Sequence, residues 1–227
     1  MKYSREIAGR LPLIALLAAN AVPLVGVLFF KWDAFGIVLL YWSENVVVGF
    51  YNILKIALVK VKEPAEHLGK LFMIPFFMIH FGGFTGIHGV FVLTMFGQSD
   101  GGFMNKMSWP CHLVFVQILL NVIREAFSIM TPEMRLGLLA LFGSHGVSFV
   151  YNYLIKGEYA RTNPRKLMGA PYSRIFVMHI TIIVGGFVLM ALKSPVGLLL
   201  VLVVLKTFVD VKLHFYEHRK KGAVKVR

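Results

Sequence analysis

The sequence contains a single cysteine, Cys111, among its 227 residues. One cysteine excludes an internal disulfide and any cysteine-rich metal cluster. Charge is also scarce, because 15% of the residues are charged, against roughly 25% in soluble domains. Hydrophobic residues make up 57% of the chain, and its mean hydropathy is +0.71. This composition predicts an integral membrane protein whose main solvent is lipid.

Acidic residues are few: 11 against 24 lysine and arginine residues, for a formal net charge of +13. A basic soluble domain would point to nucleic acid. In a membrane protein, basic residues accumulate in cytoplasmic loops and tails, where they fix orientation and contact anionic headgroups. We therefore expect the lipid bilayer as partner, with anionic headgroups at the basic C-terminal tail, and no nucleic acid.

Long apolar runs divide the chain. A helix needs about 20 apolar residues to cross a bilayer, and helices satisfy their own backbone hydrogen bonds in lipid. The runs predict an all-α, polytopic helix bundle that forms one transmembrane domain over residues 1–227. The expected spans are residues 11–30, 34–59, 68–96, 136–155, 174–192 and 195–214.

A further apolar run, residues 112–130, is ambiguous because it carries a stripe of polar side chains at helical spacing. The stripe predicts an interfacial amphipathic helix rather than a span. Its members are Gln117, Asn121, Arg124, Glu125 and Ser128.

The distribution of basic residues favours six spans over seven. With six, both termini are cytoplasmic at the cell's inner membrane, and nearly all basic residues face the cytoplasm. The exceptions are Lys31, Lys106, Arg124, Arg135 and Lys193. With seven, the loop around Arg161 and the basic tail would move outside, against the positive-inside rule.

A weak internal repeat is visible at an offset of about a hundred residues. Ser43-Glu44 followed by Tyr51-Asn52 resembles Ser144-His145 followed by Tyr151-Asn152, and residues 77–80 resemble residues 176–179. Both copies would begin on the outer side, as parallel repeats do in some transporters. In such a duplication Glu44 would correspond to His145, and His80 to His179.

Glu44 lies about ten residues into the second predicted span, where an acidic side chain costs roughly 2.5–3.5 kcal/mol. His80 and His145 fall at similar depth in the third and fourth spans. Glutamate and neutral histidine are ligands that Zn²⁺ and non-haem iron prefer. We therefore predict a buried metal site. The alternative is a protonated Glu44 that bonds Asn45 or Tyr41 and only stabilises packing.

Further metal-competent residues lie toward the cytoplasmic side. His179 enters the fifth span, and Asp210, His214 and His218 follow at four-residue steps in the last one. We predict Glu44, His80, His145, His179 and His214 as ligands, with Glu44 and Asp210 as catalytic groups. The roles of His218 and of His88, which lies in a glycine-rich stretch, stay open.

The segment Tyr41-Trp42-Ser43-Glu44-Asn45, followed by Tyr51-Asn52 and a histidine in the third span, resembles a family of prokaryotic polytopic membrane proteins with a Tyr-Trp-x-Glu-Asn signature. That family is a domain of unknown function. The resemblance covers most of the chain and implies no reaction.

Four functions fit these patterns. The first is a metal-dependent hydrolase that uses metal-activated water on a lipid-embedded substrate. The second is a b-type haem protein with axial pairs such as His80 with His179 or His145. The third is a small ion-coupled carrier, for which six spans would favour a homodimer. The fourth is a scaffold in which the buried polar groups are only structural.

Overall fold

The computed structural model describes Val25, Phe29, residues 33–61, 63–97, 99–105, 107–110 and 113–192, and Leu200, Val203, Val204, Thr207 and Phe208. Within these residues every regular element is a helix, which confirms the all-α prediction for this part of the chain. The predicted spans 11–30 and 195–214 fall mainly on residues outside the described set.

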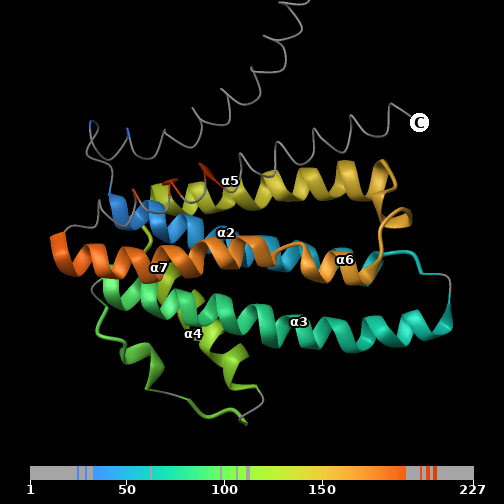
Figure 1. The fold of residues 1–227 in the computed structure, drawn as a ribbon, viewed down its shortest axis with the longest axis horizontal. Helices are drawn as coiled ribbons and strands as arrows, with labels where there is room; N and C mark the ends of the chain where they lie inside the picture. Colours follow the sequence, from blue (N-terminus) through green and yellow to red (C-terminus); the bar gives the residue numbers. More distant parts are fainter. Residues whose placement is uncertain are drawn as a thin grey trace, which may run out of the picture. The chain divides into compact units, whose positions relative to one another are not determined.

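Figure 1 shows the helices. They are α2 (Ala34–Leu58), α3 (Pro64–Phe91) with its π-helical continuation η1 (Val92–Phe96), α4 (Val114–Ile129), α5 (Pro132–Ser148) with its π-helical continuation η3 (Phe149–Ile155), α6 (Pro164–Gly169) and α7 (Tyr172–Leu192), besides the short 3₁₀ turns η2 (Gly102–Met104) and η4 (Glu158–Ala160).

Four of the described helical segments are long and apolar enough to cross a membrane. They are Ala34–Leu58, Pro64–Phe96, Pro132–Ile155 and Pro164–Val184. Each corresponds to one of the predicted spans, but three of them begin earlier than predicted.

The earlier starts have a local cause in helix capping. Glu63 forms a capping box with Glu66 at the start of α3, and the side chains of Thr131 and Asn163 accept backbone hydrogen bonds at the starts of α5 and α6. Proline follows each cap at the first helical position. Hydropathy detects only apolar residues, whereas a helix begins at its cap with a polar first turn.

The chain divides into two compact units, Val38–His179 and a second unit that joins Met1–Ile37 to Ile180–Arg227. In the second unit the Asp33 carboxylate accepts hydrogen bonds from the backbone N–H groups of Phe35 and Gly36 and so caps the first turn of α2. All polar contacts described below lie within Val38–His179.

Within Val38–His179, α2 and α5 run parallel. Leu40 lies against Gly137 near their starts, and Tyr153 donates a hydrogen bond to the Lys55 carbonyl near their ends. The beginning of α7 runs parallel to α3 in the same way, because His80 meets Tyr172 and, two turns on, His88 meets His179.

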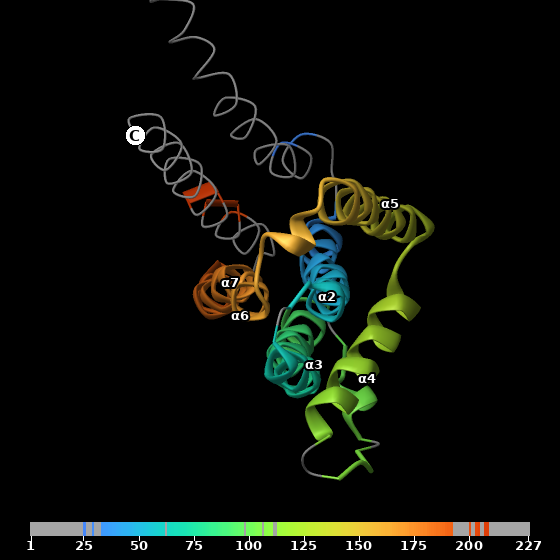
Figure 2. The same cartoon turned by 90° about the vertical axis from the view of Figure 1, so that its right-hand side faces the viewer.

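The described helix α4 differs in direction from the long helices. Figure 2 shows α2, α3 and α5 end-on, whereas α4 lies across the view. It packs against α3 through glycines: a Cβ at Gly86 would lie 3.0 Å from the Leu119 backbone nitrogen, and one at Gly89 only 2.4 Å from Val122 Cγ1. Side chains of α4 therefore fill the space that the glycine-rich stretch leaves.

The polar stripe of α4 holds the preceding loop. The Gln117 side-chain oxygen accepts hydrogen bonds from the backbone N–H groups of Ser108 and Trp109. Asn121 donates to the Phe103 carbonyl, and Ser99 donates to the Glu125 carboxylate. A stripe that periodicity predicts to face water instead satisfies the backbone of a loop, which no helical period can reveal.

Candidate functional site

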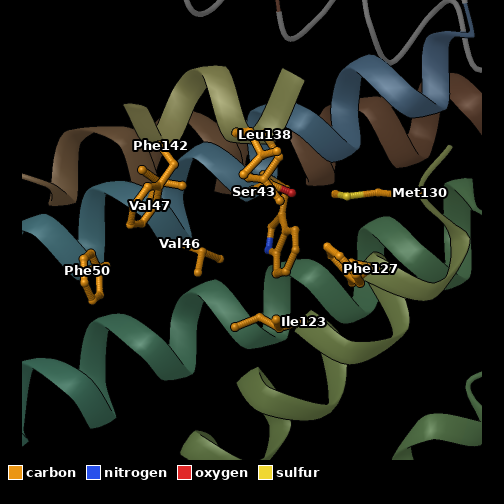
Figure 3. A pocket seen from close by; sticks show the side chains of 12 residues that line it. Ser43, Val46, Val47, Phe50, Ile123, Phe127, Met130, Leu138 and Phe142 are labelled. Atoms are coloured by element: carbon orange, nitrogen blue, oxygen red, sulfur yellow. The ribbon is translucent and has the colours of Figure 1, made fainter. Parts of the chain in front are cut away.

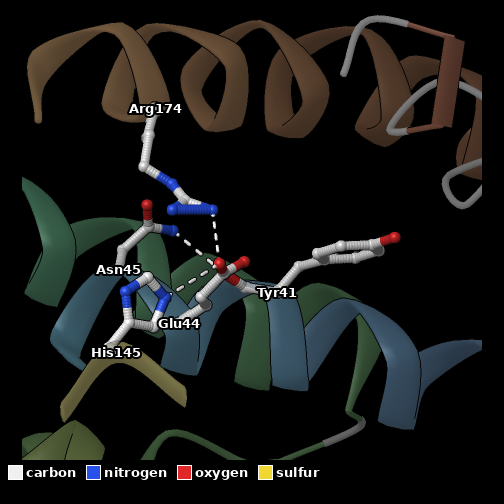
Figure 4. A network of polar contacts seen from close by, with 5 residues as sticks. All are labelled: Tyr41, Glu44, Asn45, His145 and Arg174. Atoms are coloured by element: carbon white, nitrogen blue, oxygen red, sulfur yellow. Dashed lines mark hydrogen bonds and ion pairs between the residues drawn. The ribbon is translucent and has the colours of Figure 1, made fainter. Parts of the chain in front are cut away.

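The most charged contact of the unit Val38–His179 joins three helices at Glu44. One carboxylate oxygen of Glu44, on α2, lies 2.6 Å from an Arg174 guanidinium nitrogen, on α7. The same oxygen lies 3.3 Å from Nε2 of His145, on α5. Figure 4 shows Arg174 and His145 approaching the carboxylate from different helices. Two cation-forming groups thus offset a carboxylate that would be costly alone in a span.

The three side chains are only partly shielded. The exposed fraction of the side chain is 16% for Glu44, 30% for His145 and 33% for Arg174. A charged pair at this level of burial still interacts strongly, because little water separates the groups.

Neighbouring polar groups are satisfied by backbone and do not compete for the carboxylate. The Asn45 amide donates to the Tyr41 carbonyl one turn earlier, and the Ser43 hydroxyl donates to Leu39. The Asn45 amide therefore binds the Tyr41 carbonyl rather than Glu44, which differs from the predicted bond between Glu44 and Asn45.

Tyr51 supports the histidine from the side. Its hydroxyl donates to the Phe142 carbonyl on α5, and its ring stacks near the His145 imidazole with centroids 6.4 Å apart. A Cβ at Gly146 would lie 2.7 Å from the Tyr51 hydroxyl oxygen, so this glycine permits the contact. The position of His145 is thus fixed by packing as well as by its bond to Glu44.

Two contacts between side chains join α3 to the start of α7. His80 Nδ1 lies 2.7 Å from the Tyr172 hydroxyl oxygen. His88 Nε2 lies 3.1 Å from His179 Nδ1. His88 is 3% exposed, and its Nδ1 has no hydrogen-bond partner.

In a comparison with known proteins, residues 2–226 match the model of a family of unknown function, DUF6498. The chain belongs to the DUF6498 family. This agrees with the resemblance to an uncharacterised family. No curated protein and no solved structure matches the chain.

In this DUF6498 chain the predicted metal ligands are separated. Glu44 and His145 are brought together, but His80 contacts Tyr172 and His179 contacts His88. In the part of the chain that the structure describes, no three His, Cys, Asp or Glu side chains are close enough to hold a metal ion. The metal site predicted from four of these residues is therefore not supported.

One physical reason is the ion pair of Glu44 with Arg174. A carboxylate whose oxygen already binds a guanidinium at 2.6 Å offers that oxygen poorly to a metal cation. Asp210 and His214, the other two predicted site residues, lie outside the described residues, as does His218. The predicted roles of Asp210 as a catalytic group and of His214 as a metal ligand therefore remain predictions.

The predicted haem pairs also differ from the observed contacts. His80 meets Tyr172 rather than His179 or His145. The histidines that do meet, His88 and His179, have ring nitrogens 3.1 Å apart. Iron between two axial imidazoles needs about 4 Å, twice a metal–nitrogen bond of roughly 2 Å. The observed pair is a direct hydrogen bond without space for iron.

Sequence reasoning missed Arg174 as a partner of Glu44. It assigned Arg174 to the cytoplasmic edge of a span over residues 174–192, whereas the described span is Pro164–Val184. Arg174 therefore lies ten residues after the start of that segment, in the first turn of α7, where it meets Glu44. The signal in the sequence was Asn163-Pro164, a cap followed by proline, which marks a helix start ten residues earlier.

Proposed function

We propose that this protein is a small proton-coupled membrane carrier in which Glu44 binds and releases the coupling proton. The observation that carries the proposal is the carboxylate of Glu44 bound at once by Arg174 and His145 inside the apolar helices. Intramembrane ionisable groups of this kind mark ion and proton pathways. These contacts support a proton site better than a metal site, because Arg174 and the titratable His145 already bind the carboxylate oxygen that a metal ion would need.

Proton binding can be coupled to helix movement because the proton and Arg174 compete for the same carboxylate oxygen of Glu44. When Glu44 is ionised, it holds Arg174 and thereby ties the start of α7 to α2. When Glu44 takes up a proton, the attraction to Arg174 falls and the tie between the two helices weakens. A proton thus biases the equilibrium between two helix arrangements, which is the requirement for coupling transport to a gradient.

The internal repeat supports a carrier independently. Glu44 and His145 hold corresponding positions in the two copies, and they contact each other at 3.3 Å. The helices that carry them, α2 and α5, run parallel, as do α3 and the start of α7. Carriers built from parallel repeats bind substrates and coupling ions where the repeats meet, near the middle of the membrane.

The proposed topology has six spans with both termini cytoplasmic. It is supported by the four described apolar helices and by the crossing direction of α4, which suits an interfacial helix (Figure 2). In this topology the basic tail contacts anionic headgroups of the inner membrane, and two copies form the carrier as a homodimer.

A pH jump tests the proposal and requires no identified substrate. Proton binding to a site inside the membrane field moves charge, so proteoliposomes on a solid-supported membrane should give a transient current. We expect Glu44→Gln to reduce the current to that of protein-free liposomes, because the amide takes up no proton. The matched control is Glu133→Gln, an exposed glutamate in the first turn of α5, which should keep the full current.

Only one pattern of currents agrees with the proposal. A Glu44→Gln protein that keeps the wild-type current would refute Glu44 as the proton site. Equal loss in Glu133→Gln would assign the current to surface charge instead. Solutes that change the wild-type current but not that of Glu44→Gln then identify the substrate class.

Elemental analysis and an absorbance spectrum of the purified protein test the hydrolase and haem alternatives. For a proton-coupled carrier we expect no stoichiometric zinc or iron and no Soret band. A metal that is present at one equivalent and lost in both His145→Ala and His80→Ala would instead favour the hydrolase. A Soret band that disappears on replacing His179 would favour the haem protein.

A further inference from the structure

An apolar cavity of about 440 Å³, open to the outside of the helices, lies between α2, α4 and α5 (Figure 3). All of its walls belong to the unit Val38–His179. The polar groups of its lining residues are engaged elsewhere: the Trp42 indole N–H donates to the Thr85 carbonyl, and the Ser43 hydroxyl donates to Leu39. The interior therefore offers a ligand only hydrocarbon contacts.

The size and lining of the cavity fit a hydrocarbon chain. A dry apolar cavity of about 150 Å³ accommodates one benzene ring, so a cavity of about 440 Å³ admits a considerably longer group. The walls are aliphatic and aromatic side chains such as Val46, Ile123 and Leu138. An apolar ligand gains hydrophobic burial here, whereas a polar one would lose its hydrogen bonds to water.

One arginine, on α5, contacts a lining residue of this cavity, and a second lies on α4 three residues before that lining residue. The Arg135 guanidinium lies over the ring of Phe127, 4.7 Å from its centroid, and donates to the Phe127 carbonyl. Phe127 itself lines the cavity. Arg124 is exposed and lies three residues before Phe127, hence on the adjacent part of the same helix surface. The cavity thus combines a hydrocarbon interior with a guanidinium group at a lining residue, and the acidic neighbours on the two helices are Glu125 and Glu133.

We propose that this cavity binds one acyl chain of an anionic phospholipid, with the lipid phosphate at Arg124 and Arg135. The guanidinium groups favour a phospholipid with a net negative charge over a zwitterionic one. The position also fits: Arg135 lies in the first turn of a membrane-spanning helix, and α4 ends directly before it. Headgroups are found at such helix ends.

Quenching of Trp42 by brominated lipids tests the proposal, because Trp42 lines the cavity and is 2% exposed. A protein with Trp32→Phe and Trp109→Phe retains Trp42 as its one tryptophan. It is reconstituted in phosphatidylcholine vesicles with increasing fractions of dibrominated phosphatidylglycerol or dibrominated phosphatidylcholine. We expect half-maximal quenching at a roughly tenfold lower fraction of the brominated phosphatidylglycerol.

Substitutions separate headgroup recognition from the cavity. Arg124→Gln with Arg135→Gln should remove the preference for phosphatidylglycerol. The matched control, Arg165→Gln with Lys166→Gln, removes two exposed cations of α6 and should leave the preference unchanged. Ala126→Leu narrows the cavity and should weaken quenching by both lipids, with the Trp42 emission maximum as the check on folding.

Two outcomes would overturn the proposal. Equal quenching by the two brominated lipids would mean that the cavity does not select anionic lipid. No quenching by either lipid would mean that no acyl chain enters, as when another segment of this chain fills the cavity. Neither outcome depends on Glu44, so the pH-jump current tests the carrier separately.

Discussion

Replacing Arg174 with glutamine is expected to destabilise the protein by about 3 kcal/mol, because it removes the closest cation of the Glu44 carboxylate and leaves only His145 beside it. This value is at the lower end for a broken buried pair, since Glu44 and Arg174 keep 16% and 33% of their side-chain exposure. Thermal unfolding of the detergent-solubilised protein, followed by circular dichroism, measures the loss. The matched control is Arg165→Gln, an exposed arginine on α6 that should change stability little.

A double-mutant cycle assigns the loss to the ion pair. Adding Glu44→Gln to Arg174→Gln removes the carboxylate charge, so the double variant should recover most of the lost stability. If the two losses simply add, Arg174 stabilises the protein through packing of its aliphatic stem and not through Glu44. In that case the coupling between protonation of Glu44 and the position of α7 would lose its basis.

Replacing Gly89 with alanine should destabilise the contact of α3 with α4 and α2 by about 1–3 kcal/mol. The added Cβ would lie 2.4 Å from Val122 Cγ1 and 2.6 Å from the Trp42 ring. Both neighbours are fully buried, with 0% and 2% exposure, so neither has free space to move into. The thermal unfolding midpoint of the purified variant is the measurement.

The same helix provides the control for Gly89. A Cβ at Gly69 meets no atom within 4 Å. Gly69→Ala should therefore raise stability slightly, since alanine is favoured over glycine in a helix by up to about 1 kcal/mol. Equal destabilisation by both substitutions would argue that α3 needs flexible glycines rather than close helix packing.

The beginning of α7 takes part in three side-chain contacts between helices. Tyr172, Arg174 and His179 lie within two turns of one helix and bind His80, Glu44 and His88. A change in one contact therefore acts on the same rigid element as the other two. This arrangement is the reason to expect that protonation at Glu44 affects a larger part of the site than its own pair.

The sequence alone was enough to predict four of the helices, because lipid imposes length and apolarity on any helix that crosses it. It also singled out Glu44 and His145, since an acidic group and a histidine in apolar runs stand out against their neighbours. The internal repeat even placed these two residues at corresponding positions, and they are in contact at 3.3 Å.

Only the tertiary structure decided how these residues are grouped. Hydropathy gives depth in the membrane but not the rotation of a helix about its axis, so it could not show that His80 binds Tyr172 and His179 binds His88. It also placed the start of the α6–α7 span ten residues late, which concealed Arg174. The partners of a buried charge depend on which faces of separate helices meet, and that is a property of packing between helices rather than of any single stretch of sequence.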